Sequence, residues 1–263
     1  MRIMSLRSEG VIKAVIFDLD DTLVSEYEFV VSGYRYMSER LSKRLGKSAE
    51  DINAKLWELS EKTYARVFNR LFEAYGVPLE EEELKELIHI YRDHPAGLHF
   101  YEDVYPTLKG LKERGMLTGI ISDGDPKRQW NKINSAVGYL PQVPGKEERA
   151  DRVSFFFDEI VLNDEFGGAE FRKPDPKGFI TICERLKIDP SEMIYVGDNP
   201  AKDFYIASCL PVRTARIIRD KGIYRDREYL NGIRETRRID KLTDILEMVD
   251  IKRKSAYTGD KLT

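Results

Sequence analysis

The residues best suited to chemistry are the acidic side chains of Asp18-Leu19-Asp20-Asp21-Thr22-Leu23, which directly follow an apolar run at residues 14–17. In an extended chain, residues two apart point to the same face, so Asp18 and Asp20 would lean together. Two neighbouring carboxylates repel each other, and a bound cation relieves that repulsion. Because hard oxygen ligands favour Mg²⁺, the segment predicts a magnesium site. The other interpretation, a capped helix N-terminus, accounts for one acid and leaves the others unexplained.

A second acidic segment, Gly197-Asp198-Asn199, follows the apolar run 193–196, and Asp203 comes shortly after it. Asp198 therefore occupies the same kind of position as Asp18. Gly197 would let the backbone approach its neighbours closely, because glycine has no Cβ. We expect Asp203 in the first turn of the next helix. Read alone, Gly-Asp-Asn is also a common turn sequence.

Two further groups could hold an anion. The apolar run 118–121 ends in Ser122-Asp123-Gly124, which offers a hydroxyl followed by backbone amides at the same strand end. Lys173 precedes Pro174, whose ring stiffens the backbone that carries the lysine. A fixed ammonium could neutralise both a phosphate and a nearby carboxylate. In isolation, these residues would equally fit an ordinary strand end and a solvated loop lysine.

These candidates need a scaffold that brings strand ends together. Short apolar runs rich in Ile and Val, without alternation, are typical of strands buried on both faces of a parallel sheet. Helical patterns at 104–114 and 177–186 separate some of these runs, which predicts a doubly wound α/β core. Ligands of such sheets bind at the carboxyl ends of the strands. The predicted strands are residues 14–17, 118–121, 159–162, 193–196 and 214–218.

About a hundred residues between the first two strands lack any strand signal. They show helical patterns at 26–45, 49–75 and 80–92, with Gly46, Gly76 and Pro95 as stops. We therefore expect an inserted helical domain. The expected domains are a core from residues 1–23 and 99–251, a helical domain 24–98, and a mobile tail 252–263. Residues 138–152 are expected to form an exposed loop.

The composition narrows the function classes. The 263 residues carry a formal net charge of −3, whereas a nucleic-acid binder usually shows a basic excess. No run of about 18 apolar residues is present, so no membrane-spanning helix is expected. The N-terminus lacks the apolar region of a signal peptide. The expected location is the cytoplasm, and nucleic acid and membrane are not expected partners.

In their order along the chain, these four segments resemble the haloacid dehalogenase superfamily of hydrolases, in its phosphatase type. The similarity extends from about residue 13 to about residue 249. The Asp-x-Asp-x-Thr segment at Asp18 is its most specific part, and the Gly-Asp-x-x-x-x-Asp segment from Gly197 to Asp203 is next. The resemblance implies a Rossmann-like core of five parallel strands in the order 5-4-1-2-3. It also implies that the helical insertion is an α-helical cap, which closes over a small substrate.

The resemblance assigns roles to individual residues. Asp18 would be the nucleophile that forms an aspartyl-phosphate, and Asp20 the general acid and then the base. Asp203 would lie in the acidic pocket, and Thr22 would support the first loop. Mg²⁺ would be held by Asp18, the carbonyl of Asp20, and Asp198, and the transferring phosphoryl group by Ser122, Asp123 and Lys173.

Two positions bear on the reaction class. The dehalogenases that gave the superfamily its name lack an acid two residues after the nucleophile, so Asp20 argues against cleavage of a carbon–halogen bond. Many phosphomutases of this type have Gly where this chain has Asp21, which favours a phosphatase. We therefore expect a Mg²⁺-dependent hydrolase of small phosphorylated metabolites such as sugar phosphates. The alternatives are a phosphomutase or phosphotransferase, and a non-catalytic phosphate-binding regulatory protein. The sequence does not determine the oligomeric state.

Overall fold

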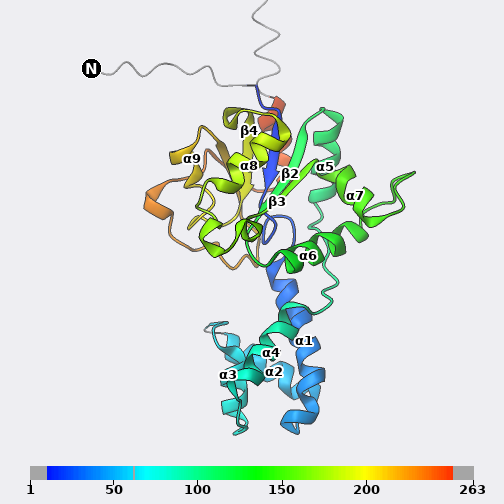
Figure 1. Ribbon diagram of the computed structural model, residues 1–263, viewed down its shortest axis with the longest axis vertical. Helices are drawn as coiled ribbons and strands as arrows, with labels where there is room; N and C mark the ends of the chain where they lie inside the picture. Colours follow the sequence, from blue (N-terminus) through cyan, green and yellow to red (C-terminus); the bar gives the residue numbers. More distant parts are fainter. Residues whose placement is uncertain (1–10, 62, 251–263) are drawn as a thin grey trace, which may run out of the picture. The chain divides into compact units, whose positions relative to one another are not determined.

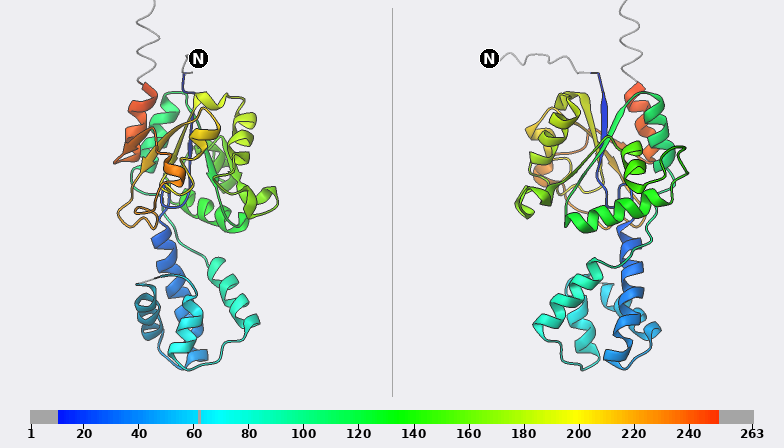
Figure 2. Two further views of the ribbon diagram at one scale, coloured as in Figure 1. Left: turned by 90° about the vertical axis from the view of Figure 1, so that its left-hand side faces the viewer. Right: turned by 45° about the vertical axis from the view of Figure 1, so that its right-hand side comes forward.

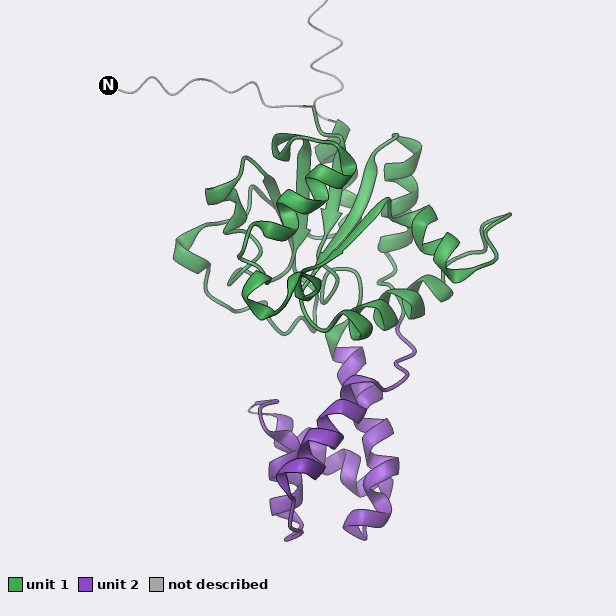
Figure 3. Cartoon of the chain, viewed as in Figure 1, with its two compact units in different colours: residues 1–26, 99–263 green, residues 27–98 purple. Residues whose placement is uncertain are grey.

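The computed structural model describes residues 11–61 and 63–250. It divides into two compact units (Figure 3). The first unit combines residues up to Glu26 with those from His99 onward, and the second is Tyr27–Leu98. The insertion was expected to start at residue 24, whereas the second unit starts at Tyr27. The expected mobile tail, 252–263, lies outside the described residues.

The first unit is built on a parallel sheet, as the sequence predicted. In the described residues this sheet has six strands in the order β3-β2-β1-β4-β5-β6, and every neighbouring pair is parallel. The first five strands follow the predicted order. The sixth was missed, because Arg237-Arg238-Ile239 is too short and too charged to read as a buried strand. The strands are β1 (Ala14–Phe17), β2 (Leu117–Ser122), β3 (Glu159–Leu162), β4 (Met193–Gly197), β5 (Arg213–Ile217) and β6 (Arg237–Ile239).

The central strands are buried on both faces, which explains their unbroken apolar sequences. All residues of β1 and β4 are buried. Ala14 and Ile16 pack with Phe179 and Ile182 of α8 (Lys177–Leu186) and with Ile206 of α9 (Ile206–Cys209). On the other side of the sheet lies α5 (Val104–Glu113), which packs against β2 (Figure 2). Helices therefore cover both faces of the sheet, which confirms the predicted doubly wound α/β class.

The register of the sheet aligns the ends of its central strands. Phe17 of β1 pairs with Val196 of β4, and the amide of Asp18 continues the ladder with a 2.8 Å bond to the Val196 carbonyl. Asp18 therefore starts its loop beside Gly197. Helix α6 (Pro126–Gly138) runs along this carboxyl edge (Figure 1). It begins where Asp125 accepts a 3.0 Å bond from the amide of Arg128, which is a regular N-cap.

The second unit is helical, with a core centred on Met37, Ile52, Leu56 and Phe72. The single helix expected at 49–75 is two helices. The break lies before Arg66, which has a left-handed φ of 53°. Arg70 stabilises the break by donating to the carbonyls of Leu59, Thr63 and Ala65 at 2.6–2.9 Å. The helices of this unit are α1 (Glu26–Leu45, whose first residue belongs to the first unit), α2 (Ala49–Ser60), α3 (Val67–Ala74) and α4 (Glu81–Arg92).

The segment 138–152 is only partly the exposed loop that we expected. Its last residues belong to α7 (Arg149–Phe156), and Arg152 is buried, donating to the carbonyl of Leu140 at 2.6 Å. Arg152 thus connects α7 to the residues that follow α6. The irregular part, between the end of α6 and the start of α7, is limited to residues 139–148. Among the described residues, no helix has both the length and the apolar character that crossing a membrane requires.

Candidate active site

Three buried carboxylates meet at the carboxyl edge of the sheet. Each of Asp18, Asp198 and Asp203 offers an oxygen, and these oxygens all lie within 4.8 Å of one another. Burial, together with the charges of Asp203 and Asp18, raises the pKa of Asp198 well above its ordinary value. Such a set stabilises a bound cation, because the cation offsets both the repulsion and the loss of hydration. The donor set therefore fits a divalent metal ion that prefers oxygen ligands.

Lys173 supplies a fixed positive charge to the same cluster. Its side chain is fully buried, with Nζ 2.5 Å from Asp18 Oδ1 and 3.0 Å from Asp203 Oδ1. Nζ also donates to the hydroxyl of Tyr195 at 2.7 Å. Burial alone would lower the pKa of Lys173, but Asp18, Asp203 and Asp123 outweigh it and raise the pKa. The lysine stays charged, and its ammonium contacts the carboxylate predicted to be the nucleophile.

Asp18 itself is under opposing influences. Burial raises its pKa to about 6, although Lys173 and Lys202 pull it down and the other carboxylates push it up. A carboxylate in this setting is poorly hydrated and held close to a cation. Poor hydration keeps a carboxylate oxygen available for attack on an electrophile, since less water must be displaced.

The carboxylate of Asp20 is held by α6. Lys132 Nζ lies 2.7 Å from Asp20 Oδ1, and Gln129 Nε2 donates to Asp20 Oδ2 at 3.1 Å. Gln129 also donates to the hydroxyl of Ser122 at 2.6 Å. Although burial alone would raise the pKa of Asp20, Lys132 and Gln129 lower it. The predicted acid–base residue and the predicted phosphate-binding serine are thus joined through a single glutamine.

Lys132 is shared with a second carboxylate. Its Nζ also lies 2.6 Å from Glu26 Oε2, at the start of α1. Burial raises the pKa of Glu26 to about 7, while Lys132 opposes that rise. One buried ammonium therefore fixes two acids from different elements.

The carboxylate of Asp123 accepts hydrogen bonds from two neighbouring lysines and so holds them at the site. Its Oδ1 accepts from the Lys173 amide at 3.0 Å and from Asn163 at 2.8 Å, and its Oδ2 accepts from Lys202 at 2.7 Å. Burial opposes ionisation, but Lys173 and Lys202 lower the pKa of Asp123 to about 2. A carboxylate repels phosphate, so any contribution of Asp123 to phosphate binding must come from its backbone amide.

The loop after β1 is anchored by Asp21 and Arg219. Asp21 has a left-handed φ of 51°, and its carboxylate accepts from the amides of Glu26 at 3.0 Å and Ile223 at 2.8 Å. Arg219 donates to the carbonyl of Thr22 at 2.7 Å. Among the described residues, the buried hydroxyl of Thr22 has no hydrogen-bond partner. The contacts that hold this loop thus come from Asp21 and from the carbonyl of Thr22.

Gly197 is required by the close approach of Asp203. A Cβ at position 197 would lie 2.5 Å from Asp203 Oδ2, which is too short for a real contact. Asp203 Oδ2 also accepts from the amide of Asn199 at 2.8 Å. Asp203 was expected in the first turn of a helix, but α9 begins only at Ile206, so Asp203 lies in the preceding turn.

Several residues that complete this cluster were not predicted from the sequence. Gln129 and Lys132 lie one helical turn apart on α6, and Glu26 begins α1. Lys202 directly precedes Asp203, and this position beside a predicted site residue is the signal by which it could have been found. Tyr195 faces the cluster from inside an apolar strand, where its hydroxyl donates to Asp203 at 3.3 Å, and nothing in the sequence marks it.

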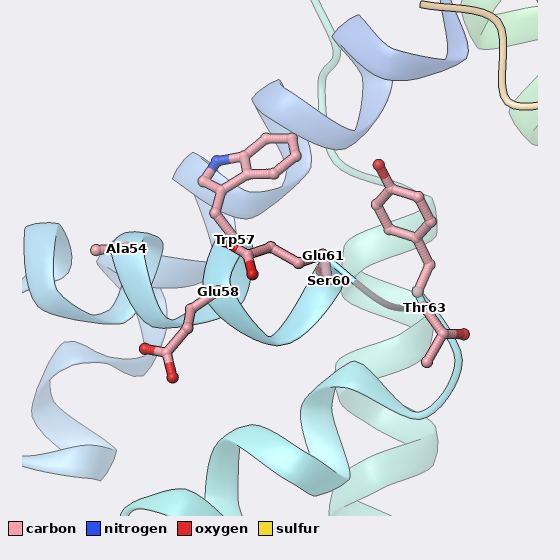
Figure 4. A pocket seen from close by; sticks show the side chains of 7 residues that line it. Ala54, Trp57, Glu58, Ser60, Glu61 and Thr63 are labelled. Atoms are coloured by element: carbon pink, nitrogen blue, oxygen red, sulfur yellow. The ribbon is translucent and has the colours of Figure 1, made fainter.

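The second unit contains a hollow of about 600 Å³ beside α2 (Figure 4). Trp57 and Tyr64 form aromatic parts of its lining, and Glu58 and Glu61 its acidic parts. Among the described residues that line it, none is basic. An acidic lining repels a phosphate ester, so this hollow is not a candidate phosphate site.

Comparison with known proteins agrees with this arrangement. The family described as haloacid dehalogenase-like hydrolase matches residues 12–207. A glyceraldehyde 3-phosphate phosphatase from Methanopyrus kandleri is 31% identical over 227 residues, which cover 84% of this chain and 89% of that protein. Pyrophosphatase PpaX from Bacillus velezensis is 25% identical, covering 92% of this chain and 98% of its own. The crystal structure of a HAD phosphatase from Thermococcus onnurineus superposes with a TM-score of 0.56 at 26% identity, covering 90% and 98% of the two chains.

Proposed function

Because this chain belongs to the haloacid dehalogenase-like hydrolases and is a phosphatase, we propose that it hydrolyses small phosphomonoesters through an aspartyl-phosphate on Asp18, with Mg²⁺ as the metal. One observation carries this proposal: Lys173 Nζ lies 2.5 Å from Asp18 Oδ1 inside a cluster of three buried carboxylates. That is the charge arrangement that an anionic nucleophile needs in order to approach an anionic substrate.

In the first step, a carboxylate oxygen of Asp18 attacks the phosphorus and the bond to the ester oxygen breaks. Lys173 offsets the negative charge of the phosphoryl oxygens, and the hydroxyl of Ser122 donates to one of them. A bound phosphate dianion raises the pKa of the neighbouring Asp20 carboxyl, so Asp20 takes up a proton and then gives it to the departing oxygen. Gln129 contacts both Asp20 and Ser122, so it keeps the proton donor aligned with the phosphoryl site.

In the second step, water attacks the phosphorus and the bond to the Asp18 oxygen breaks, which releases inorganic phosphate. Asp20 takes a proton from that water and is ready for the next ester. The carboxylates of Asp18 and Asp198, with the carbonyl of Asp20, would hold Mg²⁺, and Asp203 lies beside them. When bound, the metal supplies positive charge that offsets the repulsion between carboxylate and phosphate.

The substrate is a small phosphorylated molecule, because the relatives act on such compounds by name. We further propose that the helical unit Tyr27–Leu98 serves as the cap that selects among them. A small phosphorylated metabolite, such as a sugar phosphate, was the expectation from the sequence alone, and a cytoplasmic location remains a prediction from the sequence.

The test is hydrolysis of p-nitrophenyl phosphate by the full chain, with and without Mg²⁺. We expect turnover that requires the metal and falls to the buffer background in an Asp18→Asn variant. The matched control is Asp226→Asn, because Asp226 is 91% exposed and lies in a loop. An acid quench during turnover should trap one phosphoryl group on the wild type and none on the Asp18→Asn variant.

Two results would contradict the proposal. Turnover without a trapped phosphoryl group, and with Asp18→Asn still active, would point to direct attack by water. Inertness towards a panel of aryl, sugar and anhydride phosphates with Mg²⁺, Mn²⁺ and Co²⁺ would instead favour the non-catalytic phosphate-binding alternative.

A further inference from the structure

Helix α6 presents three polar side chains to the site, and two of them are already engaged. Gln129 and Lys132 bind the two oxygens of Asp20. Arg128 lies four residues before Lys132, so the two cations share one side of the helix. The carboxylates of Asp20 and Glu26 are bonded to Lys132, which leaves the guanidinium of Arg128 for another anion.

Arg128 is unusual in its lack of contacts. Across residues 11–61 and 63–250, its guanidinium has no hydrogen-bond or ion-pair partner, and its Nε is buried. Buried donors in native proteins are nearly always paired, and an exception calls for an explanation. An arginine near a reaction centre can be explained by a partner that arrives with the substrate.

Two observations locate this guanidinium. A Cβ built on Gly124 would lie 2.8 Å from Arg128 Nη2, so the guanidinium covers the loop that follows Ser122. Arg128 also directly precedes Gln129, whose Nε2 donates to Asp20 Oδ2 at 3.1 Å. Arg128 therefore lies on the side of the site where Asp20 is held.

The position next to Asp20 determines what Arg128 can meet. In the proposed function, on which this inference rests, Asp20 gives its proton to the ester oxygen of the leaving group. A cation beside Asp20 that has no partner of its own can therefore meet the leaving group, while Lys173, which contacts Asp18, meets the phosphoryl group. A guanidinium forms paired hydrogen bonds with the oxygens of a carboxylate or of a phosphate.

We propose that Arg128 binds an anion on the leaving group, and that the substrates of this enzyme are phosphate esters or anhydrides whose leaving group carries a carboxylate or a second phosphoryl group. The phosphorus–oxygen bond breaks as before, Asp20 protonates the ester or bridging oxygen, and the anion of the leaving group stays paired with Arg128 until release. A neutral sugar or aldehyde lacks this partner, so it leaves the guanidinium unpaired.

The experiment compares esters of similar size in the full chain. 2-Phosphoglycolate has an anionic leaving group, 2-hydroxyethyl phosphate has a neutral one, and pyrophosphate offers a second phosphoryl group. We expect the wild type to prefer the anionic compounds by about 10- to 100-fold in kcat/KM, the value of a charged hydrogen bond. Whether phosphoglycolate or pyrophosphate is better will tell which anion is the natural one.

Variants at α6 identify the group responsible. Arg128→Gln should reduce the preference to about threefold or less, and Arg128→Lys should keep part of it, because the charge remains without the paired donors. Lys127→Gln is the matched control at the preceding, exposed position, and it should retain the wild-type preference. The thermal midpoint of each variant shows whether the fold is intact.

Calorimetric binding of the three compounds to the Asp18→Asn protein separates this inference from the proposed function. If the wild type hydrolyses nothing, but the Asp18→Asn protein binds the anionic compounds more tightly and loses that preference with Arg128→Gln, the inference stands and the enzymatic proposal fails. If the wild type prefers no anionic compound, or Arg128→Gln keeps the preference, the inference is wrong.

Discussion

The ammonium of Lys132 lies 2.7 Å from the carboxylate of Asp20, the residue that we propose protonates the leaving group. Lys132 is almost wholly buried, and it also contacts Glu26 at 2.6 Å. The position of the predicted acid–base residue thus depends on a helix that lies more than a hundred residues later in the chain. This dependence makes the function of Asp20 testable through its neighbour.

Replacing Lys132 by Met should impair proton transfer more than phosphate binding. Without the ammonium, Asp20 and Glu26 repel each other and the Asp20 carboxylate loses its orientation. A misplacement of about 1 Å can lower a rate about 10²-fold. We expect a loss of that order in kcat for an alkyl phosphate, whose leaving group needs a proton. The loss for p-nitrophenyl phosphate should be smaller, because nitrophenolate departs without one.

Steady-state kinetics on the two esters check this prediction. Lys109→Met is the control, because Lys109 is 62% exposed on α5. Equal losses on both esters would mean that Lys132 supports the site in general and does not act through Asp20.

Asp198 should show opposite effects on stability with and without metal. In the absence of metal, Asp198 is buried beside Asp203 and Asp18, so Asp198→Asn removes like-charge repulsion and should raise the unfolding temperature. A metal at about 100 times its Kd should raise the wild-type unfolding temperature by roughly 5–10 °C. The variant should lose most of that rise.

Thermal unfolding in Mg²⁺ and in a chelator measures both effects, with Asp226→Asn as the exposed control. A variant that keeps the full metal-dependent rise would show that Asp198 is no metal ligand.

The sequence predicted those parts of the site that lie at strand ends. Asp18, Ser122 and Asp198 each follow an apolar run, and the parallel sheet brings such positions to one edge. Gly197 was expected to allow a close approach, and Asp203 makes that approach. In these cases local sequence is sufficient, because the strand itself determines where the next side chain lies.

Residues on α6 could not be found in the same way. Lys127, Arg128 and Lys132 form a polar pattern typical of a solvated helix. Only the packing of α6 along the sheet edge turns Arg128 and Lys132 towards the site. The break before Arg66 is similar, since it depends on three carbonyls that Arg70 gathers from outside its own helix. Strand β6 exists because β5 offers an edge for pairing, whereas its own sequence is too charged to predict a strand.

Asp123 should make the stability of the protein depend on acidity. Its pKa is about 2 in the folded protein, compared with an ordinary value of 3.8. Between these values the unfolded chain binds more protons than the folded one, so stability falls as the pH falls from about 4 to about 2. The full difference corresponds to about 2 kcal/mol. Asp123→Asn should lack this component.

Urea unfolding of the wild type and of Asp123→Asn, at several pH values from 5 to 2, isolates the effect of this carboxyl from that of the others. The difference between their free energies of unfolding should shrink as the pH falls. A difference that stays constant would mean that Lys202 and Lys173 do not stabilise the charged form of Asp123.

Gly197→Ala should disturb the carboxylate cluster from the backbone side. The added methyl would lie 2.5 Å from Asp203 Oδ2 and 2.7 Å from its Cγ, so either Asp203 or β4 must move. Overpacking of this kind costs about 1–3 kcal/mol of stability. Because Asp203 is bonded to Lys173, the shift should reach Asp18 and lower kcat. Gly138→Ala is the control, since nothing lies within 4 Å of its added Cβ. A stable Gly197→Ala protein with unchanged kcat would show that the distance between Gly197 and Asp203 has no bearing on the nucleophile.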